Sequence, residues 1–412
     1  MPTSEDTDCF VYLQLPGSLE TVTCGRLAIA NGVGRFVYRK RFVEDPRAVE
    51  LDKFVLPLRA GTFETARLKG VFGALRDAAP DAWGQRVIER QLKTSGLSEL
   101  AYLLHSPEDR AGALSFGRGV EPPPPVHSFN KVLQLEALME QAARIEADLP
   151  VPEQVIRLVM PGTSMGGARP KNVVEDHDGL WLAKFPSRSD RWTNAPVEAG
   201  MLELARWCGL RSAEARVVKV GQGRVLLVKR FDRAKVEGGY HRHRMVSALT
   251  VLRSDEDAQA RANGSYVSLA DELRRWVISP DEDLHELYGR MVFNALISNI
   301  DDHPRNHALI AGPNGWHLAP AYDLTPAPAA SVDQRDLAME IGTRGRWANR
   351  ENCLSQAIRF RLSREEANAR IDQIRSVVTA RWPEAVRKHG ATERDCEQIA
   401  SAFAYPGFEY AA

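Results

Sequence analysis

The chain has 412 residues, of which 44% are hydrophobic, and Lys plus Arg equal Asp plus Glu at 54 each. At about 150 residues per domain, this length predicts two or three domains with full hydrophobic cores. The zero formal charge excludes a chain-wide basic surface for nucleic acid. No apolar run approaches the roughly 20 residues of a membrane span, and the acidic, polar N-terminus lacks a signal-peptide core. We therefore expect a cytoplasmic protein without a membrane contact.

The N-terminal part of the chain is expected to form a separate, β-rich module. Residues 11–13 and 36–38 have strand-type composition, and residues 84–92 have a helical pattern. Residues 121–125 then read Glu-Pro-Pro-Pro-Pro, and consecutive prolines favour an extended, semi-rigid spacer. We expect the module to span 1–119 and a linker to span 120–127. After residue 240 the pattern is mainly helical, with helices predicted at 267–276, after 279 and at 370–382.

Small residues fill the segment 161–168 between two apolar stretches. Glycines let backbone N–H groups approach phosphate oxygens that side chains would keep away. The segment predicts a phosphate-covering loop, although it matches neither the Walker A pattern nor GxGxxG. A plain flexible hairpin is the alternative interpretation. The predicted ligand-contacting residues of this loop are Gly162, Ser164, Gly166 and Gly167.

Residues 180–186 form a strand pattern with Lys184 near its end. A lysine at this place can reach nucleotide phosphates as a compact charge, and kinases hold such a lysine with a helix glutamate. Glu198 lies 14 residues further on and opens an amphipathic helix pattern that continues to Trp207. A Lys184–Glu198 ion pair is therefore predicted. The alternatives are a surface lysine with a buried stem and an ordinary first-turn acid beside the helix dipole.

Residues 299–306 read Asn-Ile-Asp-Asp-His-Pro-Arg-Asn and follow a strong helix pattern. Ser279, Pro280 and Glu282 are typical of a helix start, and apolar residues recur at helical spacing from 284 to 296. After the acidic segment, apolar residues at 308–310 and 316–318 flank a Gly-Pro-Asn-Gly turn, which predicts a hairpin. A buried helix should therefore deliver Asp301, and Asp323 should follow the hairpin.

The order of these polar residues is typical of phosphoryl transfer. In protein kinases a catalytic Asp precedes a magnesium-binding Asn by five positions, and a second metal-binding Asp follows. Asp301 and Asn306 keep that spacing, and Asp323 lies 17 residues after Asn306. Magnesium prefers oxygen ligands, which Asn306 and Asp323 supply, and Asp301 is the candidate base. Asp302 is its rival, and a polar loop that merely caps backbone groups is the alternative for the whole segment.

Together these segments resemble the HipA family of bacterial serine/threonine kinases, which act as toxins in toxin–antitoxin pairs. Residues 79–84, 109–114 and 226–233 add to the resemblance, which covers most of the chain. It implies an α+β, protein-kinase-like, two-lobed fold with a β-rich N-terminal subdomain at 1–119. A kinase N-lobe would span 128–236, with the Gly-rich loop and the ATP lysine. A mainly helical C-lobe with the catalytic loop would span 237–412.

The resemblance also implies roles for individual residues. Carried over by position, it assigns the catalytic base to Asp301, the Mg²⁺ ligands to Asn306 and Asp323, the phosphate-contacting lysine to Lys184, and the adenine contacts of ATP to the backbone of Lys229, Arg230 and Phe231. Ser164 would carry an inhibitory autophosphorylation, with Thr163 as the adjacent alternative. A phosphate there adds about −1.5 to −2 charge, which would repel the nucleotide.

The expected function is an ATP- and Mg²⁺-dependent protein serine/threonine kinase acting as the toxin of a HipA/HipB-type pair. The implied partner is a small DNA-binding antitoxin similar to HipB, so DNA is reached only indirectly. The implied substrate is a translation-related protein such as an aminoacyl-tRNA synthetase. A small-molecule phosphotransferase of similar fold, and a catalytically silent binding partner of an antitoxin, are the two alternative functions.

Overall fold

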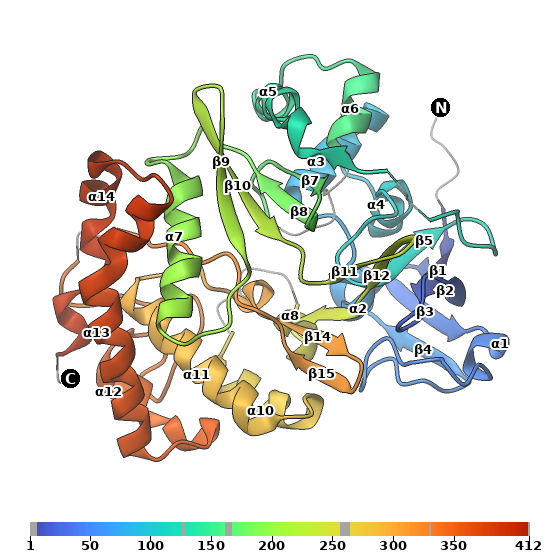
Figure 1. The fold of residues 1–412 in the computed structure, drawn as a ribbon. Helices are drawn as coiled ribbons and strands as arrows, with labels where there is room; N and C mark the ends of the chain where they lie inside the picture. The colour runs from blue at the N-terminus through green and yellow to red at the C-terminus, as the bar shows by residue number, and fades with distance from the viewer. Residues whose placement is uncertain (1–5, 126–127, 161–166, 256–263, 329–330, 411–412) are drawn as a thin grey trace. The chain divides into compact units, whose positions relative to one another are not determined.

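The structure is a computed structural model that describes residues 6–125, 128–160, 167–255, 264–328 and 331–410 (Figure 1). The chain forms two compact units. The first, called the N-terminal unit here, consists of Met1–Ser187, Lys229–Val246 and Ile310–Pro313. The second, the C-terminal unit, consists of Arg188–Val228, Ser247–Leu309 and Asn314–Ala412. The division predicted from the sequence, into an N-terminal subdomain, a linker, a kinase N-lobe and a C-lobe, stays a prediction.

An antiparallel five-stranded sheet carries the core of the N-terminal unit, in the order β4-β3-β2-β1-β5. Its strands are β1 (Asp8–Gln14), β2 (Thr21–Ala30), β3 (Val33–Tyr38), β4 (Thr62–Thr65) and β5 (Leu114–Gly117). Alternate residues of β3 face the core, so Phe36 and Tyr38 are buried while Val37 is 43% exposed. The Phe36 and Tyr38 rings pack edge-on with centroids 4.9 Å apart. Strands expected at 11–13 and 36–38 are therefore present.

The rest of the N-terminal unit adds shorter elements. Its helices are α1 (Lys40–Val43), α2 (Gly73–Arg76), α3 (Ala82–Leu92), α4 (Glu99–His105), α5 (Leu135–Glu146) and α6 (Glu153–Val159). Strand β6 (Asn130–Lys131) pairs in parallel with β7 (Lys171–Asp176), and β7 pairs antiparallel with β8 (Gly179–Lys184). A hairpin of β11 (Arg233–Val236) and β12 (Gly239–Arg242) follows, then β13 (Met245–Ser247). Lys184 is thus the last residue of the strand predicted for it.

The turn between β7 and β8 carries the acids Asp176 and Asp178 beside His177, a combination of residue types that can bind metals. Oδ1 of Asp176 accepts hydrogen bonds from the backbone N–H of Asp178 and from Nε1 of Trp181, both at 2.8 Å. An Asp that binds the backbone two residues further on is an ordinary turn former. We therefore assign Asp176 to shaping this hairpin.

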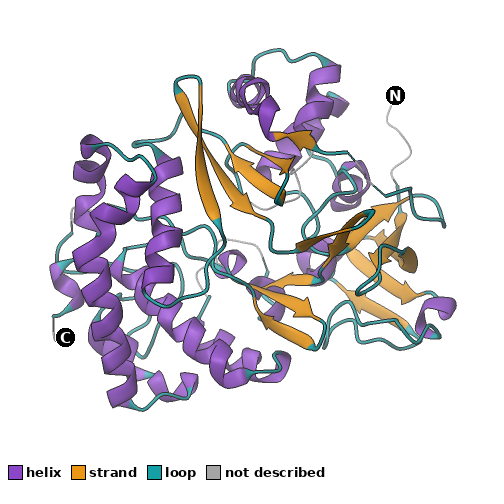
Figure 2. Cartoon of the chain, in the orientation of Figure 1, coloured by secondary structure: helices purple, strands orange, loops and turns teal. Residues whose placement is uncertain are grey.

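Helices dominate the C-terminal unit (Figure 2). They are α7 (Asn194–Trp207), α8 (Ala248–Val251), α10 (Tyr266–Trp276), α11 (Pro280–Leu296), α12 (Arg350–Ser355), α13 (Arg364–Lys388) and α14 (Glu393–Ile399), beside a hairpin of β9 (Ala215–Val220) and β10 (Gly223–Lys229). Helix α11 packs against α10 and α13 and is buried along most of its length. It begins where predicted, although the Ser279 side chain makes no capping hydrogen bond. Among the residues described, no helix is both long and apolar enough to cross a lipid bilayer.

Helix α13 continues through Pro383, where the sequence pattern predicted an end. A proline inside a helix removes one hydrogen bond and costs about 3 kcal/mol or more. The part beyond Pro383 packs on α7 so closely that a Cβ on Gly200 would lie 2.8 Å from Val386. Glu203 of α7 also pairs with His389 at 2.6 Å, just past the helix end. These contacts between distant segments offset the local cost, and no local pattern could reveal them.

Candidate active site

The chain between α11 and β14 (Ala308–Gly312) forms a tight loop, called the acidic loop here (residues 297–307), which ends in the 3-10 turn η3 (Pro304–Asn306). The backbone N–H of His303 donates to the carbonyl of Asp301 at 2.9 Å, and that of Asn306 donates to the carbonyl of His303 at 2.8 Å. Nδ2 of Asn306 donates to the Asp301 carbonyl at 3.2 Å. The two residues with five-position spacing are therefore brought together. Because Nδ2 is used, Oδ1 of Asn306 is the atom left to accept a cation.

The adjacent acids of this loop have opposite environments. Asp301 is exposed, whereas Asp302 is only 1% exposed. Oδ2 of Asp302 accepts hydrogen bonds from the Tyr266 hydroxyl and from Nε2 of His307, the latter at 2.8 Å. A buried carboxylate that already has two donors is poorly placed to receive a substrate hydroxyl. The environment therefore favours Asp301 over Asp302 for contact with a substrate.

The sequence reasoning missed the residues that support this loop. Tyr266 lies 36 residues before Asp302, and Asn294 donates to the Tyr266 hydroxyl at 3.0 Å. Asn294 occurs inside a helical pattern and Tyr266 directly before one, and neither residue type there signals anything about a distant carboxylate. His307 directly follows Asn306, the predicted metal ligand. This position beside a candidate site residue is the one feature of the sequence that indicates a role for His307.

The hairpin of β14 and β15 (Gly315–Leu318) leads to Asp323, as predicted. The backbone N–H of Ala319 donates to the carbonyl of Ala308 at 2.8 Å. Arg290, buried in α11, donates to the Ala319 carbonyl at 2.7 Å and is itself held by Glu286 at 2.7 Å. The path towards Asp323 is therefore fastened to the same helix that delivers the acidic loop.

A second contact joins the Asp323 segment to the acidic loop. The Tyr322 hydroxyl donates to the Arg305 carbonyl at 2.7 Å, which links the residue before Asp323 to the residue before Asn306. Asp323 itself has φ +59°, in the left-handed region that only Gly, Asn and Asp adopt readily. The two predicted metal ligands thus lie on segments that one hydrogen bond connects.

Lys184 and Glu198 belong to different units, so their ion pair stays a prediction. Lys184 is half-buried at the end of β8. Glu198 is buried, and α7 begins at Asn194 instead of at Glu198. Since helix-dipole stabilisation fades beyond the first turn, the alternative of an ordinary first-turn acid does not hold for Glu198.

Most of the predicted Gly-rich loop, including Gly162, Thr163, Ser164 and Gly166, lies outside the described residues. Gly167, where the description resumes, has φ +85° and is exposed. Its backbone N–H donates to Oδ2 of Asp81 at 2.7 Å. Asp81 belongs to the segment 79–84, which carried part of the family resemblance. This contact attaches Gly167 to the N-terminal module, and the N–H of Gly167 already has an acceptor.

The segment predicted to meet adenine is engaged with the rest of the N-terminal unit. The backbone N–H of Arg230 donates to the carbonyl of Leu180 at 3.0 Å, and the Lys229 ammonium lies 5.6 Å from the Trp181 ring centroid. Phe231 follows in the turn before β11. The adenine contacts of Lys229, Arg230 and Phe231 stay predictions, and the Arg230 N–H already has an acceptor.

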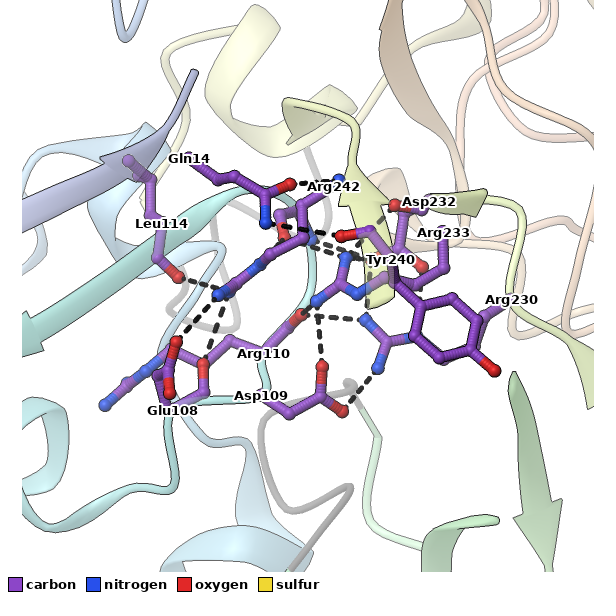
Figure 3. Close-up of polar contacts among 11 residues, drawn as sticks. Gln14, Glu108, Asp109, Arg110, Leu114, Arg230, Asp232, Arg233, Tyr240 and Arg242 are labelled. Atoms are coloured by element: carbon purple, nitrogen blue, oxygen red, sulfur yellow. Dashed lines mark hydrogen bonds and ion pairs between the residues drawn. The ribbon is translucent and has the colours of Figure 1, made fainter. Parts of the chain in front are cut away.

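The Arg230 side chain lies in a buried ion cluster (Figure 3). Arg230 pairs with Asp109 at 2.5 Å and with Asp232 at 2.8 Å. Arg233 pairs with the same two carboxylates, at 2.9 Å and 2.7 Å. The backbone N–H of Gly112 donates to Asp232 at 2.9 Å. Two sequence motifs noted separately, 109–114 and 226–233, therefore meet in one network.

Burial alone would raise the pKa of Asp232, but the neighbouring charges of Arg230 and Arg233 lower it. The same two arginines lower the pKa of Asp109 against its burial. Both carboxylates are therefore charged, and the cluster is stable only with all partners in place.

Comparison with known proteins defines the class of fold. Residues 163–382 match the HipA-like C-terminal domain, and residues 18–117 match the HipA N-terminal domain. The structure resembles a chain of the Shewanella oneidensis complex of HipA, HipB and its operator DNA, with a TM-score of 0.70. That likeness covers 95% of this chain and 94% of the other, at 19% sequence identity. The fold is thus of the HipA type, and the predicted α+β class, β-rich first and mainly helical later, is confirmed.

Relatives identified by sequence agree with that result. "Putative kinase Y4mE" of Sinorhizobium fredii is 24% identical over 330 residues, which are 75% of this chain and 76% of the relative. The "Serine/threonine-protein kinase toxin HipA" of Shewanella oneidensis is 24% identical over 154 residues, 34% of this chain and 36% of that protein. Because the C-terminal domain match covers more than half of the chain, this protein belongs to the HipA family.

The ion cluster generates a stability prediction. Asp109→Asn removes one charge and leaves Arg230 and Arg233 incompletely paired in a buried place, so we expect a loss of about 3–5 kcal/mol in the free energy of unfolding. Urea denaturation at neutral pH measures this loss. The control is Asp8→Asn in the same unit. Asp8 pairs with Arg26 at 2.6 Å, but this pair is partly exposed to water and should contribute little to the free energy of unfolding. Equal stability of the two variants would contradict the assignment.

Proposed function

We propose that this protein is an ATP- and Mg²⁺-dependent protein serine/threonine kinase that acts as the toxin of a HipA/HipB-type toxin–antitoxin pair. One observation carries the proposal: the exposed Asp301 lies beside Asn306, joined by the 3.2 Å hydrogen bond from the Asn306 side chain. The Tyr322–Arg305 contact fastens the Asp323 segment to the same loop. Membership of the HipA family supports this chemistry.

The chemistry of the donor set suits magnesium. Asn306 offers an amide oxygen because its nitrogen is already used, and Asp323 offers a carboxylate. Mg²⁺ prefers such oxygen ligands and keeps several waters, so two protein ligands together with nucleotide phosphates suffice. Asn306 and Asp323 would hold the metal, and Lys184, held by Glu198, would contact the phosphates. When bound, the metal–nucleotide supplies the phosphoryl group and a counter-charge for it.

Asp301 would orient the acceptor hydroxyl and take up its proton. Its exposure supports this role, because a serine or threonine of a folded protein substrate must reach the carboxylate from solvent. The backbone around Lys229, Arg230 and Phe231 would meet the adenine, and the Gly-rich loop with Gly162, Ser164, Gly166 and Gly167 would cover the phosphates.

The proposed partner is a small DNA-binding antitoxin similar to HipB. The Shewanella oneidensis structure with the same fold contains HipA, HipB and operator DNA. Zero formal net charge supports DNA contact through the partner instead of through this chain. The proposed substrate is a cytoplasmic, translation-related protein such as an aminoacyl-tRNA synthetase.

Removal of the proposed base should separate nucleotide binding from phosphoryl transfer. Asp301→Ala keeps the Asp301 carbonyl that Asn306 binds, so we expect ATP–Mg²⁺ to raise the thermal unfolding temperature as in the wild type. Phosphorylation of host proteins after controlled expression should fall about 10²–10⁴-fold, measured by phosphoproteomics. Asp333→Ala, an exposed acid of the same unit, serves as control. Wild-type phosphorylation by Asp301→Ala would refute the proposed role, and a phosphorylated metabolite without protein targets would indicate the small-molecule alternative.

Removal of a proposed metal ligand should weaken nucleotide binding itself. Asp323→Asn deletes the charge, and Asn tolerates the left-handed backbone at φ +59°. We therefore expect the unliganded thermal stability to be retained, while the Kd for ATP in the presence of Mg²⁺ rises at least about tenfold, a loss of ~1.4 kcal/mol. Titration calorimetry with and without Mg²⁺ measures the change. A magnesium-dependent affinity equal to that of the wild type would argue against Asp323 as a ligand.

Autophosphorylation on the Gly-rich loop is expected at Ser164. After incubation with ATP and Mg²⁺, intact-mass spectrometry should show the addition of one phosphate to the wild type and none to Ser164→Ala. Asp301→Ala should also stay unmodified, because it lacks the base. Thr163→Ala is the matched control and should still gain the phosphate. The reverse pattern for Ser164→Ala and Thr163→Ala would move the acceptor to Thr163.

A further inference from the structure

Two ties cross the acidic loop, each between residues five positions apart. The outer tie is the hydrogen bond from Nδ2 of Asn306 to the Asp301 carbonyl, at 3.2 Å. The inner tie lies one residue further along on both sides, where Nε2 of His307 faces Oδ2 of Asp302 at 2.8 Å. Because each residue of the outer tie is bonded covalently to one of the inner tie, the inner tie fixes the backbone that presents Asp301 and Asn306.

The inner tie is anchored in two helices. Tyr266, the first residue of α10, donates its hydroxyl to Oδ2 of Asp302. Asn294 of α11 donates to the Tyr266 hydroxyl at 3.0 Å, and Asn299 donates to Oδ1 of Asn294 at 3.1 Å. Tyr266 and Asn294 are fully buried. Burial and the nearby Asp302 carboxylate hold the pKa of Tyr266 well above its usual value, so its hydroxyl remains a donor.

His307 is held as firmly as Asp302. Its carbonyl accepts the backbone N–H of Ala248 at 2.8 Å, and its ring lies edge-on to Tyr266 with centroids 5.4 Å apart. Nδ1 of His307 has no hydrogen-bond partner within the described parts of the chain. We place an N–H on Nε2 of His307 because that atom faces the Asp302 carboxylate.

We propose that Asp302 is a positioning residue: through Tyr266 and His307 it holds the acidic loop in the conformation that presents Asp301 and Asn306. Asp302 touches neither the substrate nor the metal in this scheme. The doubled acid of the sequence thus has two functions, one exposed and chemical, one buried and supporting. The inference rests on the proposed function for the roles of Asp301 and Asn306, but not for the contacts of Asp302.

Three variants test the proposal by kinetics. Asp302→Ala removes the acceptor and leaves two buried donors unsatisfied, whereas Asp302→Asn keeps a neutral acceptor and Tyr266→Phe removes one donor. We expect kcat to fall about 10–100-fold in Asp302→Ala and about tenfold in the two milder variants. The KM for ATP should change less than about threefold, since the Asn306 and Asp323 side chains remain. Combining Asp302→Asn with Tyr266→Phe should lower kcat little more than either change alone, because both changes break the same hydrogen-bond network.

The matched control is Tyr288→Phe. Tyr288 is also fully buried in the C-terminal unit and packs edge-on to Phe360 at 5.3 Å. Its hydroxyl has no hydrogen-bond partner among the residues described, so its removal should leave kcat unchanged. If Tyr266→Phe and Tyr288→Phe had the same kcat, or if only the KM for ATP changed, the positioning role would be overturned.

Hydrogen exchange separates this inference from the proposed function, because it needs no kinase activity. The backbone amides of Asp302, His303, Asn306 and His307 all donate within the acidic loop. Mass spectrometry of the full chain should show them exchanging about tenfold faster in Asp302→Ala, and faster to a lesser degree in Asp302→Asn and Tyr266→Phe. Unchanged exchange in all three overturns the inference. If the three variants exchanged faster and the wild-type protein transferred no phosphate, the positioning role would be supported and the kinase proposal refuted.

Discussion

A buried charge is stable only when oppositely charged groups or hydrogen-bond donors surround it, and this constraint determines which segments pack together in both units of the protein. In the N-terminal unit it joins Asp109 to Arg230, 121 positions apart in sequence. In the C-terminal unit it joins Asp302 to Tyr266, 36 positions apart. The partners of each buried carboxylate come from distant segments, so pairing the charge also fixes the path of the chain between them.

The same constraint explains how the candidate site is built. Its exposed acid, Asp301, lies beside a buried acid, Asp302, whose Oδ2 accepts two hydrogen bonds. The same loop contains Ser298, just past the end of α11, with φ +53°. The Ser298 hydroxyl donates to the Ala402 carbonyl at 2.6 Å and accepts from Arg335 at 2.7 Å. These hydrogen bonds maintain the left-handed backbone at Ser298, as is common at functional sites. The exposed acid of the site is therefore carried by a loop that buried hydrogen bonds support.

Sequence patterns predicted the elements whose stability is local and misplaced the ends that depend on packing. The α11 helix, the β14–β15 hairpin and the β8 strand follow from periodicity and turn residues. Helix α13 passes Pro383 because α7 packs against it, and α7 begins before Glu198. For α13 the difference arises from contacts with α7 between residues nearly two hundred positions apart, which periodicity does not record.

The sequence by itself determined that Asp301 and Asn306 lie close together, because their five-position spacing lets one hydrogen bond join them within a single short loop. It also determined the family, since several short motifs occur in one order. Only the tertiary structure showed that Asp301 is exposed while Asp302 is buried, and only it brought the motifs at 109–114 and 226–233 together. The reason is physical: spacing is a property of the covalent chain, whereas access to water and the supply of hydrogen-bond donors depend on which remote segments pack alongside.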